Sequence, residues 1–250
     1  MNITIIGGGH IGVACALGLR DVASIKVTVR SAESLARYNY AGISASRNNK
    51  EAVMDADIVM FCVRTPQLQE AVESVKDLLG GKLVVSMAAQ MPPLQMKEMV
   101  GEGIELAYVI PNVAIAHKES MTFISSVSAS EASVKLLEDL FNTAGKTLVV
   151  PMEMLKAGIS LASCGIGYAL NYIAAASRGG EKLGFSRGQA VEIVTQTVLG
   201  AALVQDASND SPEDEVCKVA TPGGLTERGV NAMEKAGFSA SVIASLFPDD

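Results

Sequence analysis

The sequence predicts an α/β protein in which a doubly wound, largely parallel sheet is followed by an all-helical C-terminal domain. Three observations predict it. Short apolar runs alternate with helical stretches through residues 1–150, a glycine-rich turn follows the first apolar run, and strand patterns stop near Pro151. With 250 residues, 49% of them hydrophobic, the chain is long enough for two modest domains with well-filled cores.

The N-terminal strands follow from apolar runs separated by turn-forming residues. A strand at residues 3–6, a helix at 11–19 and a strand at 25–29 form a β-α-β unit. Further strands are predicted at residues 58–63, 83–86, 106–110, 121–124 and 147–150. This alternation of strand and helix is typical of a doubly wound sheet.

The C-terminal part shows helical periodicity. Apolar residues recur at helical spacing over residues 155–176, 187–205 and 226–236. Residues 206–215, rich in Ser, Asp, Asn and Pro, are predicted to form a polar loop. The change of pattern near Pro151 predicts a first domain at residues 1–150 and a helical substrate and dimerisation domain at residues 151–250.

Charge and cysteine content exclude several classes of function. The net charge is −7 and no basic run occurs, so we expect no nucleic-acid partner. The four cysteines lack the spacing of a metal site, and only His10 and His117 could join them, so we expect no bound metal. They are interpreted as free thiols of a cytoplasmic protein. The N-terminus lacks the basic segment and apolar core of a signal peptide, so we expect no export.

One apolar stretch bears on membranes and on assembly. Residues 157–177 are uncharged and about long enough to span a bilayer, but they contain several glycines, serines and Asn171. A helix packed inside an oligomer explains this composition better than a membrane helix. The apolar faces of residues 157–177 and 191–204 exceed what so small a domain could hide alone. We therefore expect no membrane contact, and a homodimer or larger homo-oligomer built by the C-terminal helices.

The glycine-rich turn at residues 7–12 fits G-x-G-x-x-G directly after the first strand and at the start of a helix. Gly7 permits the tight turn, Gly9 lets the backbone approach a pyrophosphate, and Gly12 allows close packing of helix and strand. In this context the pattern predicts a Rossmann-type dinucleotide site.

The second strand ends at Arg30 and Ser31, where an NAD-binding fold usually places an acidic residue for the ribose 2′-hydroxyl. Arg30 offers the opposite charge and Ser31 a hydroxyl, and both suit a 2′-phosphate. These residues therefore favour NADP. The alternative is that Arg30 is a solvated surface residue.

A second glycine-rich turn precedes a helix near the C-terminus. Pro222 fixes the backbone, and Gly223 and Gly224 carry no side chain to block a ligand from the amides at the helix start, which suit a carboxylate. Thr221 can cap the helix, and Thr226 lies one turn in, where its hydroxyl could bond the rest of that ligand. The alternative for Thr226 is a hydroxyl bonded back to its own helix.

This second turn resembles the motif of the pyrroline-5-carboxylate reductase family, small-Ser/Thr-Pro-Gly-Gly-x-Thr followed by Ala/Gly-aliphatic. The matching positions are Ala220, Thr221, Gly223, Gly224, Thr226, Gly229, Val230, Met233 and Glu234. Four other segments are similar to the family's cofactor-binding stretches: residues 49–51, 62–66, 84–89 and 111–112. The resemblance thus covers most of the chain.

The resemblance implies hydride transfer from NADPH to the C=N carbon of 1-pyrroline-5-carboxylate, giving proline, in a site between the domains. Thr226 would hydrogen-bond the ring nitrogen, while Thr221 and the Gly223 and Gly224 amides would hold the carboxylate. Because the imine nitrogen is readily protonated, the reaction needs orientation more than a strong acid. The residues assigned to the cofactor are Gly7, Gly9, His10, Ile11, Gly12, Arg30, Ser31, Asn49, Val63, Arg64, Ala88 and Asn112.

The chain departs from the family pattern around the substrate. Where the family reads Ser-Gly-Ser-Gly-Pro-Ala-Tyr, residues 162–168 read Ala-Ser-Cys-Gly-Ile-Gly-Tyr, and Ala174 and Arg178 stand at positions that are acidic in the family. Two alternatives therefore stay open. One is a related NADP-dependent reductase of another small carboxylate-bearing imine or carbonyl, and the other is a non-catalytic dinucleotide-binding relative whose substrate pocket is closed.

Overall fold

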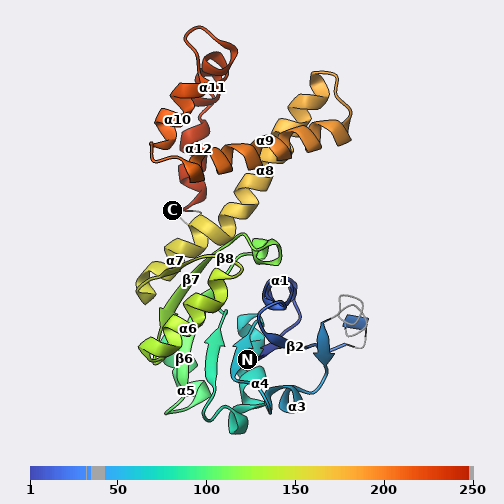
Figure 1. Cartoon of the computed structure of the whole chain (residues 1–250), viewed down its shortest axis with the longest axis vertical. Coiled ribbons are helices and arrows are strands. Elements are labelled where there is room, and N and C mark those ends of the chain that lie inside the picture. Colours follow the sequence, from blue (N-terminus) through green and yellow to red (C-terminus); the bar gives the residue numbers. More distant parts are fainter. Residues whose placement is uncertain (32, 35–42, 248–250) are drawn as a thin grey trace. The chain divides into compact units, whose positions relative to one another are not determined.

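The computed structural model describes residues 1–31, 33–34 and 43–247 of the 250-residue chain (Figure 1). Its contacts divide the chain into two compact units, Met1–Ser163 and Cys164–Asp250.

The first unit is built on one eight-stranded sheet with the order β3-β2-β1-β4-β5-β6-β7-β8. The strands are β1 (Asn2–Ile6), β2 (Ser24–Thr28), β3 (Ser44–Ser46), β4 (Ile58–Phe61), β5 (Leu83–Ser86), β6 (Glu105–Ile110), β7 (Ser120–Ser126) and β8 (Gly145–Val149). Strands β1 to β6 pair in parallel, β7 runs antiparallel to β6, and β8 is parallel to β7. The predicted doubly wound sheet is confirmed, and its order reverses between β1 and β4, where such folds bind ligands.

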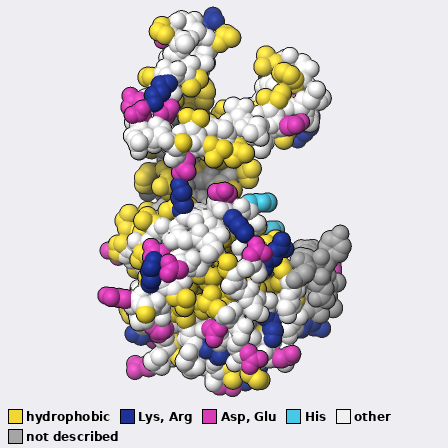
Figure 2. Space-filling model, in the orientation of Figure 1, with side chains coloured by type: hydrophobic (Ala, Val, Ile, Leu, Met, Phe, Trp, Pro, Cys, Tyr) yellow, Lys and Arg dark blue, Asp and Glu magenta, His cyan; other side chains and the backbone are white. Residues whose placement is uncertain are grey.

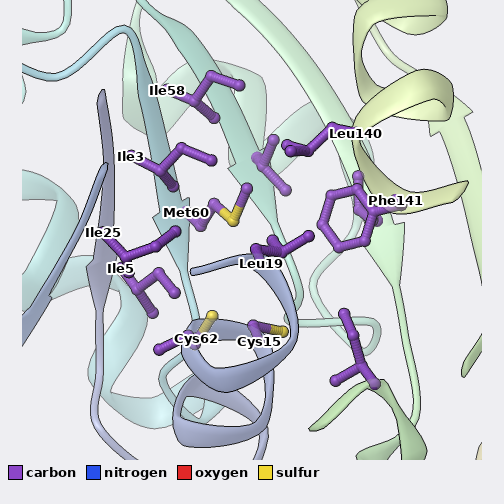
Figure 3. Close-up of a cluster of buried hydrophobic side chains, with 14 of the residues drawn as sticks. Ile3, Ile5, Cys15, Leu19, Ile25, Ile58, Met60, Cys62, Leu140 and Phe141 are labelled. Carbon is purple, nitrogen blue, oxygen red and sulfur yellow. The ribbon is translucent and has the colours of Figure 1, made fainter. Parts of the chain in front are cut away.

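Helices cover both faces of the sheet. On one face lie α1 (His10–Leu19) and α6 (Glu131–Asn142), and their residues Leu19, Leu140 and Phe141 belong to one buried cluster with Ile3 of β1 and Met60 of β4 (Figure 3). The other face is covered by α3 (Asn49–Val53), α4 (Thr65–Glu73) and α5 (Pro93–Val100). Three short 3₁₀ helices of the first unit are η1 (Lys76–Leu78), η2 (Val113–His117) and η3 (Met152–Met154). Burial on both faces explains why the central strands read as continuous apolar runs.

The strand β3 was not predicted from the sequence. It consists of Ser44, Ala45 and Ser46 and pairs with β2 from Lys26 to Thr28. Three small residues show neither an apolar run nor an alternating pattern, so the pairing depends on the neighbouring strand rather than on local preference.

The predicted helix at residues 155–176 is interrupted. It begins as α7 (Leu155–Gly158), continues as one π-helical segment, η4 (Ile159–Ser163), and becomes α8 (Cys164–Lys182). A Cβ at Gly158 would lie 3.0 Å from the ring of Phe123 on β7, so this glycine lets α7 lie close to the sheet. The chain packs on the sheet as far as η4, which is why the two units divide after Ser163. The domain boundary predicted at residue 150 stays a prediction.

The described residues of the second unit form helices joined by short loops. After α8 come α9 (Arg187–Ala207), α10 (Pro212–Val219), α11 (Leu225–Lys235) and α12 (Phe238–Ser245). The polar loop predicted at residues 206–215 is shorter than expected and spans residues 208–211, because α9 continues to Ala207 and α10 begins at Pro212. Ser211 accepts a hydrogen bond from the Asp214 amide and caps this helix, so the Ser, Asp and Pro residues there are helix-start residues rather than loop residues.

Burial differs sharply between the units. Among the described residues of the second unit only Ser177 and Ala190 are buried. Large apolar side chains lie open on its helices, as the yellow surface of Figure 2 shows, including Leu170, Val191, Ile193, Leu199, Leu203 and Val204. The described chain contains one helical stretch, Met152–Lys182, that is long and apolar enough to cross a membrane by length and composition. A single chain thus leaves a large apolar surface uncovered.

Candidate functional site

Each glycine of the first turn has the geometry that its predicted role requires. Gly7 has a φ of 112°, and a Cβ there would lie 2.7 Å from the carbonyl oxygen of Cys62. A Cβ at Gly12 would lie 2.1 Å from the Gly7 carbonyl oxygen, so only glycine allows α1 to approach the turn. A Cβ at Gly9 would meet no atom within 4 Å, which leaves open space in front of the turn.

The start of α1 is free to bind an anion. Gly9 is its N-cap residue and supplies no side chain to the helix amides. The first intrahelical bond is donated by the Val13 amide to the Gly9 carbonyl at 3.0 Å, so the amides before it have no helical acceptor. The Gly7 and Gly8 amides donate to the Thr28 carbonyl at 3.3 and 3.0 Å, which fixes the turn to the end of β2.

A cavity of about 1450 Å³ lies in front of this turn, large enough for an extended ligand. Its lining includes Gly7, Gly9, His10, Ile11, Arg30, Ser31, Asn49, Val63, Arg64 and Ala88, all assigned to the cofactor from the sequence. Gly12 and Asn112 lie outside the described lining. The cavity therefore brings together residues from the ends of five strands.

Asn112 has a local structural role. It is buried at 5% exposure, and its Oδ1 accepts from the Ala114 amide at 2.9 Å. Its Nδ2 donates to the Ala162 carbonyl of η4 at 3.5 Å, and its amide donates to Ser120 Oγ at 3.1 Å. The side chain thus joins the end of β6 to the π-helical segment.

Sequence reasoning missed six polar residues of the lining: Ser34, Arg47, Gln67, Glu70, Ser74 and Gln90. Gln67 and Glu70 lie in the first turns of α4, directly after β4, where side chains of such folds face the ligand. That position could have indicated them. Arg47 follows β3, and without that strand the sequence offered no reason to place it at the same edge.

The cavity is positively charged although the chain is not. Its described lining contains Arg30, Arg47 and Arg64 but, as a carboxylate, Glu70 alone. The whole chain has a net charge of −7. A local excess of arginine in an acidic protein is the electrostatic arrangement expected for a polyanionic ligand.

Two free thiols, Cys15 and Cys62, are buried near the cavity. Cys62 donates to Met87 Sδ at 3.2 Å, and Cys15 lies beside it (Figure 3). Burial raises the pKa of Cys62 well above its ordinary value, with a further contribution from Cys15, and burial raises the pKa of Cys15 to about 12. Both therefore stay protonated near neutral pH and are not thiolate nucleophiles. The described residues contain no group of three His, Cys, Asp or Glu that could hold a metal ion.

The second glycine-rich turn, residues 221–224, is closed by its own backbone. The Gly224 amide donates to the Thr221 carbonyl at 2.9 Å across Pro222 and Gly223. Gly223 has a φ of 71°, as a type II turn with proline in the preceding position requires. A Cβ at Gly224 would lie 2.5 Å from Thr221 Oγ1, so this glycine is needed for a close approach.

The expectation that Thr221 caps α11 is wrong. The N-cap residue is Gly224, and no side chain caps the helix. The reason is geometric, because closing the turn with the Thr221 carbonyl places that residue three positions before the cap.

Both glycine amides assigned to a carboxylate already have acceptors inside the chain. The Gly223 amide donates to Glu227 Oε2 at 2.7 Å, and the Gly224 amide donates to Thr221. The amides of Leu225 and Thr226, in the first turn of α11, have no helical acceptor. An external carboxylate would therefore meet these two amides first, or would displace Glu227 from Gly223.

Thr226 is exposed at the start of α11. Its hydroxyl makes no hydrogen bond to any residue that the structure describes. By contrast, the Thr197 hydroxyl, within α9, donates to the Ile193 carbonyl at 2.8 Å. The back-bonded alternative for Thr226 is thus not formed, and its hydroxyl remains available to a ligand.

Two family models match the two parts of the chain. Residues 152–247 match the model described as pyrroline-5-carboxylate reductase dimerisation, and residues 2–90 match the one described as NADP oxidoreductase, coenzyme F420-dependent. The first covers the helices with the exposed apolar faces, and the second covers the glycine-rich turn and most of the cavity lining.

Curated relatives agree with the family models. The chain is 30% identical to pyrroline-5-carboxylate reductase of Arabidopsis thaliana over 207 residues, which cover 82% of this chain and 75% of that protein. It is 30% identical to pyrroline-5-carboxylate reductase 1 of Dictyostelium discoideum over 98% of this chain, but spans only 48% of that longer protein.

A solved structure has the same fold. Plasmodium falciparum pyrroline carboxylate reductase with NADP bound superposes with a TM-score of 0.88, covering 99% of this chain and 95% of that one at 21% identity. The two proteins therefore share a fold.

Proposed function

This chain belongs to the pyrroline-5-carboxylate reductase family, and we propose that it reduces the C=N bond of 1-pyrroline-5-carboxylate to give proline, with NADPH as the reductant. One observation carries the proposal for this chain's own residues. The same chain contains an arginine-rich cavity in front of an open glycine turn and, at a second glycine turn, a threonine hydroxyl with free helix amides.

The cavity residues fit NADPH. The turn at Gly7 and Gly9 and the free amides of α1 would hold the pyrophosphate, and Arg30 with Ser31 would hold the 2′-phosphate. Ala88 lies at the far side of the lining, after β5, where the nicotinamide would lie. When bound, NADPH supplies the hydride that reduces the C=N carbon.

The second turn would orient the substrate. The free amides of α11, with Thr221, would hold the carboxylate, and the Thr226 hydroxyl would hydrogen-bond the ring nitrogen. The imine nitrogen takes its proton from water, so no strong acid is required, and the neutral thiols of Cys15 and Cys62 play no part. These residues accelerate the reaction by positioning the C=N bond.

A homo-oligomer, at least a homodimer, completes the helical unit in this proposal. The apolar side chains of α8 and α9 are exposed in one chain and coincide with the matched dimerisation segment. Light scattering should give a mass of at least twice 26.0 kDa at micromolar concentration, and a stable monomer would contradict the proposal. We also propose a cytoplasmic protein with a small-molecule substrate and neither a nucleic-acid nor a membrane partner, which its four free cysteines and net charge support.

Cofactor oxidation with a panel of cyclic imines tests the activity. The panel contains 1-pyrroline-5-carboxylate, the same ring without its carboxylate, and a six-membered carboxylated imine. Fastest oxidation of NADPH by 1-pyrroline-5-carboxylate is the expected result. Preference for another imine would indicate a related reductase, and tight NADPH binding without any oxidation would indicate a non-catalytic relative.

A further inference from the structure

Two arginines lie at the same edge of the sheet because their strands end side by side. Strands β2 and β3 pair in parallel, with Thr28 opposite Ser46, and the Val29 amide extends the ladder to the Ser46 carbonyl at 3.0 Å. Arg30 and Arg47 follow directly and both line the cavity. Arg47 Nε donates to the Arg30 carbonyl at 3.1 Å, which joins the two strand ends.

Neither arginine has a carboxylate partner within the described parts of the chain. Other exposed cations do have one, such as Lys118, which lies 2.8 Å from Asp21. Two like charges at one rim repel each other, and a dianion bound between them would remove the repulsion and gain charge-assisted hydrogen bonds. The arrangement is therefore matched to an anion that the chain itself does not supply.

The remaining donors of both guanidinium groups suit a phosphate. The Nε bond of Arg47 leaves its terminal Nη groups available. The side-chain amide of Gln67 satisfies its hydrogen bonds when Oε1 faces Arg30. In this orientation Gln67 Oε1 accepts from Arg30 Nη1 at 3.1 Å and from Arg30 Nη2 at 3.0 Å. This contact from α4 fixes the plane of the Arg30 guanidinium while each Nη keeps a second hydrogen to donate.

We infer that Arg47 is the second arginine of the 2′-phosphate site, and that Gln67 is a positioning residue that holds Arg30 toward the same phosphate. The pyrophosphate belongs at the start of α1, whereas the ribose 2′-position of a dinucleotide lies at the end of the second strand. That is where Arg30 and Arg47 are joined. The inference rests on the proposed use of NADPH and assigns its preference over NADH to residues on two strands and one helix.

Calorimetric titration of the full-length protein with NADPH and with NADH tests this inference without measuring activity. Arg47→Gln should weaken NADPH binding by about tenfold and change NADH binding less than about twofold, since only NADPH carries the 2′-phosphate. The dependence of NADPH affinity on salt should also become less steep. Arg20→Gln is the matched control, because Arg20 is an exposed arginine beside Asp21 outside the described lining.

The role of Gln67 is tested by a double-mutant cycle. Gln67→Leu should weaken NADPH binding about threefold in the native background and have no further effect in an Arg30→Gln background, because its action passes through that guanidinium. Equal loss of NADPH and NADH binding in Arg47→Gln, or no loss of either, would overturn the inference. So would additive effects of the Gln67 and Arg30 substitutions. If NADPH is preferred as described but no imine is reduced, the proposed function fails and this inference stands.

Discussion

The two glycine-rich turns of this protein lead into helices in the same way but differ in what their amides bind. The turn at residues 7–12 directs unpaired helix amides into a charged cavity. The turn at residues 221–224 has its glycine amides bonded to Glu227 and to its own backbone. The comparison shows that the first turn leaves helix amides open to a ligand, whereas the glycine amides of the second turn already have acceptors within the chain.

The cores of the two units explain this difference. Gly7 is pressed against the end of β4, inside a sheet that is buried on both faces. Among the described residues of the second unit only Ser177 and Ala190 are buried, so that unit does not supply a comparable core. The first turn is therefore preorganised by the core of its own unit, whereas the second is held by local hydrogen bonds.

The largest expected effect is at Thr226, the residue beside the second turn that we propose orients the substrate. Thr226→Ala should lower kcat/KM by roughly tenfold to a thousandfold, about 1.4 to 4 kcal/mol, because the hydroxyl that orients the imine nitrogen is lost. NADPH affinity should stay unchanged, since the residue lies outside the described lining of the cavity. Steady-state kinetics and cofactor titration on the same preparation measure both quantities.

The matched control for this prediction is Thr226→Ser, which keeps the hydroxyl and should keep much of the activity. His10→Ala and His117→Ala should leave the chemical step nearly intact. A purely structural threonine would instead lower the melting temperature and leave turnover of the folded fraction unchanged. Undiminished kcat/KM in Thr226→Ala would remove this residue from the mechanism.

The first turn is tested by two glycine substitutions that separate packing from ligand approach. Gly12→Ala should cost about 1 to 3 kcal/mol of the free energy of unfolding, because its Cβ would lie 2.1 Å from the Gly7 carbonyl oxygen. Gly9→Ala should leave the free energy of unfolding nearly unchanged, since its Cβ meets no atom within 4 Å. It should still weaken NADPH binding about tenfold, because a methyl group would face the pyrophosphate.

Urea denaturation and cofactor titration of both variants check this pair. If Gly9→Ala bound NADPH as tightly as the native protein, the pyrophosphate would not lie at this turn. A fully stable Gly12→Ala would show that α1 can shift away from β1 at little cost.

The sequence predicts the central sheet well because local pattern and burial agree there. The strand predicted at residues 83–86 has the bounds of β5, and the glycine spacing at 7–12 predicted the tight turn that the structure shows. Arg30 was assigned from one position at the end of a strand, and it does line the cavity. In these cases each residue's role follows from its immediate neighbours in the chain.

The features that the sequence did not predict depend on distant pairing. Arg47 reaches the cavity only because β3, a strand of small residues, pairs with β2. Gln67 acts through a contact to Arg30, which is far away in the chain. The hydrogen bond that the Gly223 amide donates to Glu227 Oε2 joins residues four positions apart, but it depends on a side-chain conformation that no residue pattern specifies.

Glu227 offers a test of how the second turn differs from the first. Glu227→Gln should lower KM for 1-pyrroline-5-carboxylate about threefold to tenfold, because a neutral amide competes less with the substrate carboxylate for the Gly223 amide and does not repel it. The value of kcat should change little. A raised KM would mean that Glu227 holds the turn in its binding conformation, in which case the internal carboxylate supports the site rather than competing for it.

The smallest expected effect is at Glu105, a carboxylate that serves a helix start in the first unit. Its Oε1 accepts from the Ser130 amide at 2.7 Å and its Oε2 accepts from Ser133 Oγ at 2.7 Å, and these bonds lower its pKa from the ordinary 4.5. Because the folded-state pKa is the lower one, the carboxylate stabilises the fold above the unfolded-state pKa, and this contribution is lost as pH falls through the folded-state pKa. Glu105→Gln should therefore lower the free energy of unfolding by about 0.5 to 1 kcal/mol at neutral pH, a small loss because these bonds are partly exposed to solvent. In urea denaturation, this difference between the variant and the native protein should become smaller below about pH 4. KM should not move, in contrast to Glu227→Gln. If KM changed in both Glu105→Gln and Glu227→Gln, loss of a carboxylate at either helix start would disturb the enzyme. The proposed difference between a structural carboxylate and one beside the substrate would then be wrong.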